Sequence, residues 1–142
     1  MAEIPLFVHG LLRQGAGPLS SEGSAFAEGL RRTSRFLGLG RTQGRLYLAP
    51  GWGPVLLEAD GPGQWVAGDL LAAPEAEEFW RLLDEFEDAG PEPEALPDPR
   101  FSARRLVLPV RLESGDSTAA WGYLCNRAVE EEWRIASGDA RL

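Results

Sequence analysis

The chain has 142 residues, of which 44% are hydrophobic and 25% are charged, and its formal net charge is −8. This length suits one domain with one hydrophobic core, so we expect residues 1–142 to form a single domain. The acidic charge argues against nucleic acid and anionic membrane surfaces as partners, because both attract a basic face. No apolar run approaches the roughly 20 residues of a membrane-spanning helix.

The first half of the chain is predicted to contain four strands and one helix. The short apolar run at residues 6–9 predicts a buried strand. Residues 24–35 have a helical composition, although Gly29 weakens this prediction. Phe36 and Leu37 are expected to pack in the core. Three further strands are predicted at residues 44–48, 55–59 and 64–72, separated by turns at "APGWGP" and "GPG".

The second half begins with the clearest helical pattern in the chain, "PEAEEFWRLLDEFEDAG" at residues 74–90. Pro74 suits a first helical turn, and Gly90 with Pro91 ends the helix. The segment 91–99 holds four prolines, so we expect an exposed loop there. Two last strands are predicted at residues 104–113 and 118–126, joined by the turn "SGDS".

These elements together predict an α+β domain. Many short strands at close spacing, with one amphipathic helix, suit a small twisted or partly closed mixed β-barrel with flanking helices. Closure of a barrel removes the exposed strand edges that favour aggregation. The order of the strands does not follow from the pattern.

The predicted helix at residues 74–90 has an apolar and a charged face when its residues are placed at about 100° per step. The apolar arc holds Ala76, Phe79, Trp80, Leu82, Leu83 and Phe86. The charged arc holds Glu77, Glu78, Arg81, Asp84, Glu85 and Asp88. Glu87 is the exception, because it falls between Leu83 and Trp80 inside the apolar arc.

This position has a chemical consequence for the Glu87 carboxyl group. Desolvation near a core disfavours the ionised form, and the negative end of the helix dipole acts in the same direction, so both raise the pKa of Glu87. A carboxyl group with a pKa near neutrality suits general acid/base catalysis. The alternative is that Glu87 lies in a frayed last turn and points to solvent.

The residue types that are absent narrow the chemistry further. All 14 basic residues are arginine, which excludes Schiff-base lysines and the phosphate-binding lysine of a P-loop. One histidine and one cysteine cannot form the usual zinc sites, and we expect neither a metal nor another cofactor. The single cysteine, together with the lack of a signal-peptide pattern at the start, favours a reducing cytoplasm.

An ordered set of motifs resembles the γ-glutamylcyclotransferase-like family, also called AIG2-like. That family has a YGTLR or YGSL loop after its first strand, then a G-x-LY segment, an LDxxE segment at a helix end, a strand with Tyr and Arg, and an Ile-x-x-GDW-like tail. The matching stretches here are "FVHGLLRQG", "GRLY", "GPVLLEADG" with "VAGDL", "LLDEFED", "FSARRLVLPV", "WGYL" and "IASGDAR".

The resemblance implies a small β-barrel with a cavity where the first loop meets the end of the long helix. It implies cyclisation of a small-molecule γ-glutamyl amine or peptide to 5-oxoproline, with release of the amine. Glu87 matches the glutamate of LDxxE and takes the acid/base role. The loop formed by Val8, His9, Gly10, Leu11 and Leu12, together with Phe101, is expected to bind the substrate. Backbone N–H groups in such a loop can stabilise an oxyanion.

Some positions depart from the family pattern. His9 stands in place of the family's Tyr, Leu11 in place of Thr or Ser, and Phe101 in place of a later Tyr. Ala140 replaces the tryptophan of the tail. These departures favour the alternative function, a non-catalytic domain of the same fold that binds a small molecule or a partner, whereas the retained Glu87 favours the enzyme.

For several other residues the sequence allows more than one structural environment. His9 is expected either to shape the pocket or to pack against the backbone. Core packing is favoured over cavity lining for Tyr47 and Trp52. Solvated charges are expected at Glu58, Asp60 and Asp69 near turns, and a solvated or ion-paired position is expected at Arg13. Cys125 has no activating neighbour in the sequence and is expected to be inert.

Overall fold

A computed structural model describes residues 4–10, 29, 32–90, 92–94 and 96–140 of the chain. Their elements confirm the α+β class. The strands are β1 (Leu6–Val8), β2 (Arg35–Gln43), β3 (Arg45–Ala49), β4 (Gly53–Leu57), β5 (Trp65–Ala72), β6 (Ala103–Leu112) and β7 (Ser117–Cys125). The helical elements with described bounds are α2 (Glu77–Phe86) and the 3₁₀ turn η1 (Glu131–Trp133).

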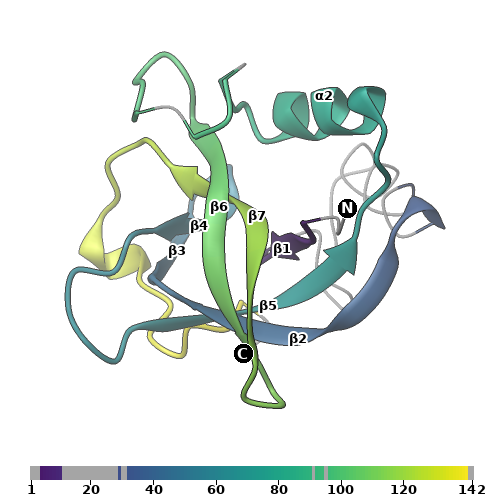
Figure 1. The fold of residues 1–142 in the computed structure, drawn as a ribbon. Coiled ribbons are helices and arrows are strands. Elements are labelled where there is room, and N and C mark those ends of the chain that lie inside the picture. Colours follow the sequence, from purple (N-terminus) through teal and green to yellow (C-terminus); the bar gives the residue numbers. More distant parts are fainter. Residues whose placement is uncertain (1–3, 11–28, 30–31, 91, 95, 141–142) are drawn as a thin grey trace.

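Five strands form a closed barrel in the order β1-β5-β2-β6-β7, and β3 pairs with β4 in a separate two-stranded sheet (Figure 1). The barrel is therefore closed rather than partly closed. All pairs are antiparallel except the one that closes the barrel, where Leu6 of β1 lies parallel to Trp121 of β7. Closure leaves no free edge among these five strands.

Strand β1 divides the core because successive side chains of a strand point to opposite faces. Phe7 packs with Leu70, Val110 and Ala120, which come from three other barrel strands. Leu6 and Val8 belong instead to the cluster that contains Leu83 of α2. A Cβ at Gly68 would collide with the Phe7 ring, so the glycine gives this ring its place inside the barrel.

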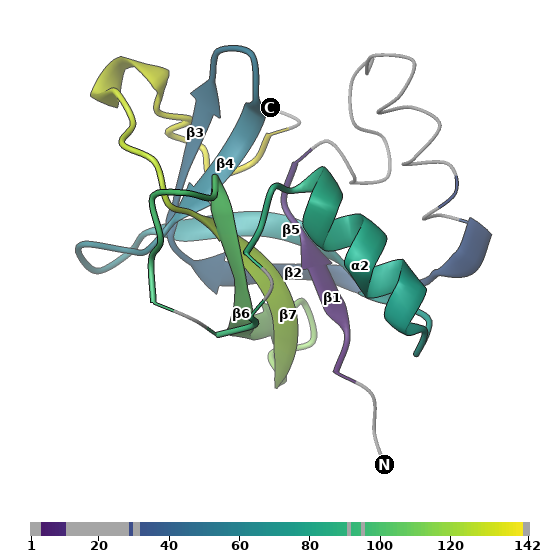
Figure 2. The same cartoon turned by 90° about the horizontal axis from the view of Figure 1, so that it is seen from above.

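Helix α2 lies across β1, as Figure 2 shows from above. It is shorter than predicted. It begins at Glu77, so Pro74 precedes it, and it ends at Phe86, ahead of Gly90. The cause of the early end is Asp88, whose φ of 53° is left-handed and cannot continue a helix. Leu83 is buried as predicted, but Leu82 and Phe86 of the apolar arc are exposed.

Strand β2 was not predicted from the sequence, and it corrects two expectations. Arg35 begins this strand rather than ending a helix, and Phe36 and Leu37 are each 46% exposed instead of packing in the core. The strand contains two glycines and a register shift between Phe36 and Gly38, which hide its alternation. The predicted helix at 24–35 falls mostly outside the described residues, although Gly29 is helical.

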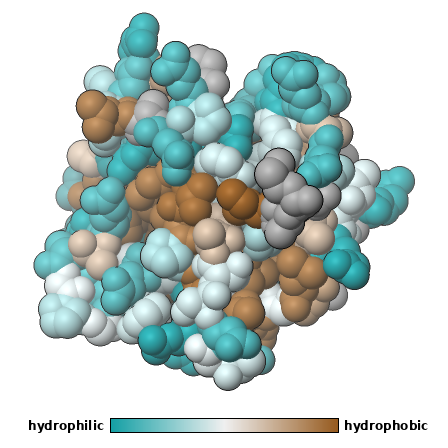
Figure 3. Space-filling model, in the orientation of Figure 1, coloured by the Kyte–Doolittle hydropathy of each residue, from teal (hydrophilic) through white to brown (hydrophobic). Residues whose placement is uncertain are grey.

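The other predicted strands are confirmed with boundaries shifted by one or two residues. The described part of segment 91–99 contains no helix or strand, in agreement with the predicted loop. Within the described residues, no helix is long and apolar enough to cross a membrane. A band of hydrophobic side chains crosses the middle of the face in Figure 3, with hydrophilic residues above and below it.

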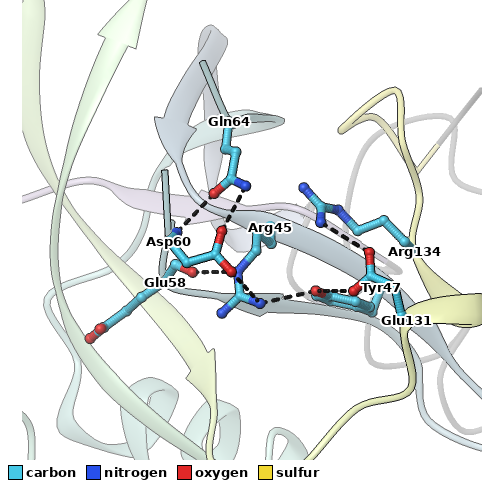
Figure 4. A network of polar contacts seen from close by, with 7 residues as sticks. All are labelled: Arg45, Tyr47, Glu58, Asp60, Gln64, Glu131 and Arg134. Carbon is cyan, nitrogen blue, oxygen red and sulfur yellow. Dashed lines mark hydrogen bonds and ion pairs between the residues drawn. The ribbon is translucent and has the colours of Figure 1, made fainter. Parts of the chain in front are cut away.

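A polar network ties the β3–β4 hairpin to the C-terminal segment (Figure 4). Arg45 donates hydrogen bonds to the Glu58 carbonyl at 2.8 Å and to the Tyr47 hydroxyl at 3.0 Å. The Tyr47 hydroxyl in turn donates to Glu131 at 3.4 Å. The backbone N–H of Ile135 donates to the Leu46 carbonyl at 2.8 Å. These contacts hold in place a hairpin that supplies one wall of the cavity described next.

Candidate active site

A cavity of about 370 Å³ opens where β1 ends, beside the C-terminal end of α2. The β3–β4 hairpin and the facing ends of β6 and β7 complete its walls. Its lining residues are 6–10, 51, 52, 54–56, 83, 86–88, 102, 103 and 123–125. Most of these side chains are apolar, with a small number of polar groups among them, which is the usual character of a small-molecule site.

Glu87 lines this cavity at the position that follows the last residue of α2. Its backbone N–H donates to the Leu83 carbonyl at 3.0 Å, so the residue is held in the final turn rather than frayed from it. Its side chain is partly buried. Desolvation by the surrounding protein, and secondarily the negative charge of Asp84, raise the pKa of Glu87 to about 7.

Asp84 lies one helical turn before Glu87 and is held by two partners. Arg105 Nε donates to its Oδ1 at 2.9 Å, and the Tyr123 hydroxyl donates to the same oxygen at 2.6 Å. The Arg105 guanidinium sits over the rings of Trp80 and Trp121, at 4.7 and 4.6 Å from their centroids. Burial, and then its hydrogen bond to Asp84, raise the pKa of Tyr123. Tyr123 therefore stays a neutral donor.

Asp88 fixes the next part of the wall. Its carboxylate accepts the Ser102 hydroxyl at 2.7 Å and the Ser102 N–H at 3.1 Å. Its carbonyl accepts the Ala103 N–H at 3.3 Å. Arg127 Nη2 donates to Ser102 Oγ at 3.5 Å, and its guanidinium lies 5.8 Å from the Trp52 ring centroid. The residue after Glu87 thus joins the helix end to the start of β6.

The end of β1 forms the wall near Pro54. Val8, His9 and Gly10 all line the cavity. A Cβ at Gly10 would lie 3.1 Å from Pro54 Cβ, so a larger residue would press on the hairpin. His9 is half-buried and has an interaction partner, which leaves both of its predicted readings open. Leu11, Leu12 and Arg13 lie outside the described residues.

Phe101 has a different position from these residues. Its ring packs where a Cβ on Gly90 would approach it to 3.0 Å. Its neighbours Ser102 and Ala103 line the cavity, whereas Phe101 is not among the described residues that do so. A role of Phe101 in substrate binding therefore stays a prediction from the family motif.

The structure also tests the positions predicted for Trp52, Tyr47 and Asp69. Trp52, for which core packing was favoured, is 49% exposed and lines the cavity, whereas Tyr47 is buried as expected. Asp69 was expected to be solvated, which is wrong, because it is 1% exposed between paired strands. Its strand β5 lies between β1 and β2, where Asp69 is opposite Val8 and Leu39.

Asp84 and Ser102 belong to the site or to its walls and were not predicted from the sequence. The helical wheel placed Asp84 on the charged face, because a wheel cannot show that Arg105 and Tyr123 reach it from other strands. The aspartate of the LDxxE motif was the available signal. Ser102 had no signal in the sequence, since its role depends on the left-handed turn at Asp88.

The remaining polar groups restrict what the cavity can hold. Cys125 lines it, and burial raises the pKa of its thiol, which disfavours the reactive thiolate. No group of three or more His, Cys, Asp or Glu residues is placed to hold a metal within the described part of the chain. The cavity is lined by Glu87, whose pKa is raised to about 7, and by residues 8–10 at the end of β1, which suits proton transfer to a bound substrate.

Residues 6–141 match the family described as gamma-glutamyl cyclotransferase, AIG2-like. No curated protein matches the chain significantly.

Solved structures show the same fold. An AIG2-like protein from Mus musculus has 27% identity and a TM-score of 0.63, with 92% of this chain and 81% of that chain covered. YkqA from Bacillus subtilis has 23% identity and a TM-score of 0.65, with 96% of this chain covered. The match spans only 39% of the Bacillus chain. A structure described as gamma-glutamyl cyclotransferase has 14% identity and a TM-score of 0.58, covering 86% and 66% of the two chains.

Proposed function

The chain belongs to the gamma-glutamyl cyclotransferase, AIG2-like family, and we propose that it cyclises a γ-glutamyl amine or peptide. The products are 5-oxoproline and the free amine. The observation that carries the proposal is that Glu87, with a pKa raised to about 7, lines the same cavity as Val8, His9 and Gly10.

The first chemical step is attack of the substrate's own α-amine on its γ-carbonyl carbon. The nitrogen must lose a proton as the new C–N bond forms, and the Glu87 carboxylate accepts that proton. The attack is intramolecular, so holding the γ-glutamyl chain in a folded conformation supplies much of the rate.

The second step breaks the bond between the γ-carbon and the nitrogen of the released amine. The protonated Glu87 returns its proton to that nitrogen, so the carboxylate is regenerated and no net proton is gained or lost. A carboxyl group with a pKa near neutrality can serve in both directions at neutral pH. An ordinary exposed glutamate is too weak a base for the first transfer.

Between these steps the γ-carbonyl oxygen carries negative charge. Backbone N–H groups at the end of β1 are the proposed donors to this oxyanion, and Gly10 permits close approach of the substrate. This part of the proposal uses backbone rather than side chains, so it tolerates His9 and Leu11 in place of the family's Tyr and Thr or Ser.

The test is an assay of 5-oxoproline released from a panel of γ-glutamyl amides, with Glu87→Gln beside the wild type. Glutamine has nearly the same shape and cannot transfer the proton, so we expect a loss of about 100- to 10,000-fold. Glu85→Gln is the matched control, because Glu85 is on the exposed side of the same helix. Equal turnover by wild type and Glu87→Gln would remove Glu87 from the mechanism.

The second candidate is a binding domain without turnover, favoured by His9 in place of the family's Tyr. It predicts that the panel compounds bind and are not cyclised. Calorimetric titration of the wild type with the same compounds separates the two functions, because binding with no 5-oxoproline supports the second.

A further inference from the structure

The ion pair between Arg105 and Asp84 is the most buried of those between described residues. The two side chains are 11% and 18% exposed, whereas the carboxylate of every other such pair is 33% exposed or more. Removing two charges from water costs free energy that their attraction largely cancels, so a buried pair adds little net stability. This pair lies one helical turn before Glu87, which directs attention to the site instead.

Side chains from one helix and two strands converge on this pair. Arg105 of β6 lies opposite Tyr123 of β7, and Trp121 is two residues before Tyr123, so these three side chains share one face of the sheet. Trp80 and Asp84 are four residues apart and share one face of α2. The guanidinium of Arg105 contacts both tryptophan rings, at 4.7 and 4.6 Å from their centroids. Arg105 therefore joins the helix to both strands.

These contacts orient the Asp84 carboxylate at the end of α2. Arg105 Nε and the Tyr123 hydroxyl donate to its Oδ1 at 2.9 and 2.6 Å, and Arg105 Nη2 donates to its Oδ2 at 3.4 Å. The last turn of the helix is thereby held against β6 and β7, and Glu87 directly follows that turn. The cation also offsets the negative charge of Asp84, the one charge that, after burial, raises the pKa of Glu87.

We propose that Arg105 is a positioning residue of the active site: through Asp84 it fixes the end of α2 that carries Glu87, and it offsets the negative charge beside Glu87. Arg105 is not among the described residues that line the cavity, so its action on the site passes through Asp84. The inference rests on the acid/base role of Glu87 in the proposed cyclisation. Lysine would supply the charge without the planar group that contacts two rings and two oxygens.

Other titratable groups also face the cavity that Glu87 lines. Among the described residues they come from the end of β1, from the residue after Glu87 and from β7: His9, Asp88, Tyr123 and Cys125. Burial raises the pKa of the Tyr123 hydroxyl and of the Cys125 thiol, so both stay neutral at the pH of the test below. None of the four groups is altered in the variants that follow, so a difference between variants originates at Arg105 or Asp84.

The test is the titration of Glu87 in the wild type, Arg105→Gln and Arg105→Lys. It is followed by the acidic limb of kcat/KM for 5-oxoproline release, and by ¹³C NMR of the Glu87 carboxyl carbon, which needs no substrate. In Arg105→Gln the charge of Asp84 acts on Glu87 without an offset, so both midpoints should rise by about 0.5–1 pH unit. The loosened helix end should also lower kcat by about 10- to 100-fold.

Two further variants separate the charge of Arg105 from its shape and from general effects. Arg105→Lys keeps the charge, so its midpoint should stay close to that of the wild type while kcat falls. Arg81→Gln is the matched control, because Arg81 pairs with two exposed acids of the same helix. It should leave the midpoint and kcat unchanged.

A double variant tests whether Arg105 acts through Asp84. In Asp84→Asn no charge is left to offset, so adding Arg105→Gln should not raise the midpoint further. An equal rise with and without Asp84 would overturn the inference, and so would an unchanged midpoint in Arg105→Gln. If Arg105→Gln does not fold, wild-type kcat in Arg105→Lys overturns it instead.

Failure of the proposed cyclisation is distinguishable from failure of this inference. If the wild type releases no 5-oxoproline, the cyclisation fails and the NMR titration still tests Arg105. A raised midpoint in Arg105→Gln then supports positioning of Glu87 in a site without turnover. An unchanged midpoint overturns the inference, whether or not the wild type is active.

Discussion

Asp84 and Glu87 lie one helical turn apart at the end of α2, where burial, and then the charge of Asp84, raise the pKa of Glu87. Asp84 is itself neutralised in part by Arg105, at 2.9 Å, and bonded by Tyr123. The two carboxyl groups of the LDxxE motif thus have different environments, one paired and one not. Separate environments are what allow one carboxyl group to titrate near neutrality.

The first prediction concerns the pH dependence of turnover. Glu87 must be ionised to accept the proton of the α-amine, so kcat/KM should rise with pH and level off above about 7. Steady-state rates between pH 5 and 9 check this, with a substrate whose own amine titrates outside the acidic limb. A profile that is flat between pH 5 and 7 would contradict the assignment.

The second prediction concerns Asp84→Asn. Removal of the negative charge lowers the pKa of Glu87, so the acidic limb of the kcat/KM profile should move to lower pH. Asparagine can still accept the Tyr123 hydroxyl, which preserves that contact. Glu78→Gln, an exposed acid on the same helix, is the control and should leave the limb in place. A structural effect alone would lower the rate without moving the limb.

The third prediction concerns stability. The pKa of Glu87 is raised from 4.5 to about 7 in the folded state. The stability linked to protonation of this carboxyl group is therefore fully present below pH 4.5, and it is lost as the pH rises through 7. At pH 8 the neutral Glu87→Gln variant should be more stable than wild type, by up to about 3 kcal/mol. At pH 4 the difference should vanish. Urea unfolding at both pH values measures it, and a variant that is less stable at pH 8 would contradict the burial of the carboxylate.

The fourth prediction concerns the barrel interior. Gly68→Ala should destabilise the fold by about 1–3 kcal/mol, because the added Cβ meets the Phe7 ring and approaches the Val8 carbonyl oxygen to 2.6 Å. Gly61→Ala is the control, since nothing lies within 4 Å of its added Cβ. Urea unfolding at one pH compares the two. Equal stability of the two variants would show that β1 can shift to accept the methyl group.

The sequence predicts those features that depend on local pattern. The apolar arc of the helix identifies Leu83 as buried, and the same arc isolates Glu87. Paired apolar runs around turns locate β3, β4, β6 and β7. These features are set by residues close together in the chain, whose periodicity is visible without knowledge of their partners.

The remaining features depend on contacts between distant residues. β2 is hidden because glycines replace the side chains that reveal alternation, and Gly40 is required by the approach of Val110. Asp84 and Asp69 resemble surface acids in the sequence because their environment is supplied by other strands. The link between Asp88 and Ser102 spans 14 residues and a left-handed turn. No local propensity encodes such pairs.

The closure of the barrel through β1 has one more consequence. This strand has three residues, meets β7 in a single bridge, and is reinforced by the N–H of Trp121 donating to the Pro5 carbonyl at 2.7 Å. Strand β1, which leads into the backbone proposed to bind the oxyanion, is therefore also the strand whose pairing with β7 closes the barrel. A ligand bound at the end of β1 would stabilise the pairing of this strand with β7 and β5. Amide hydrogen exchange along β7 and β5 should then become slower, even far from the cavity.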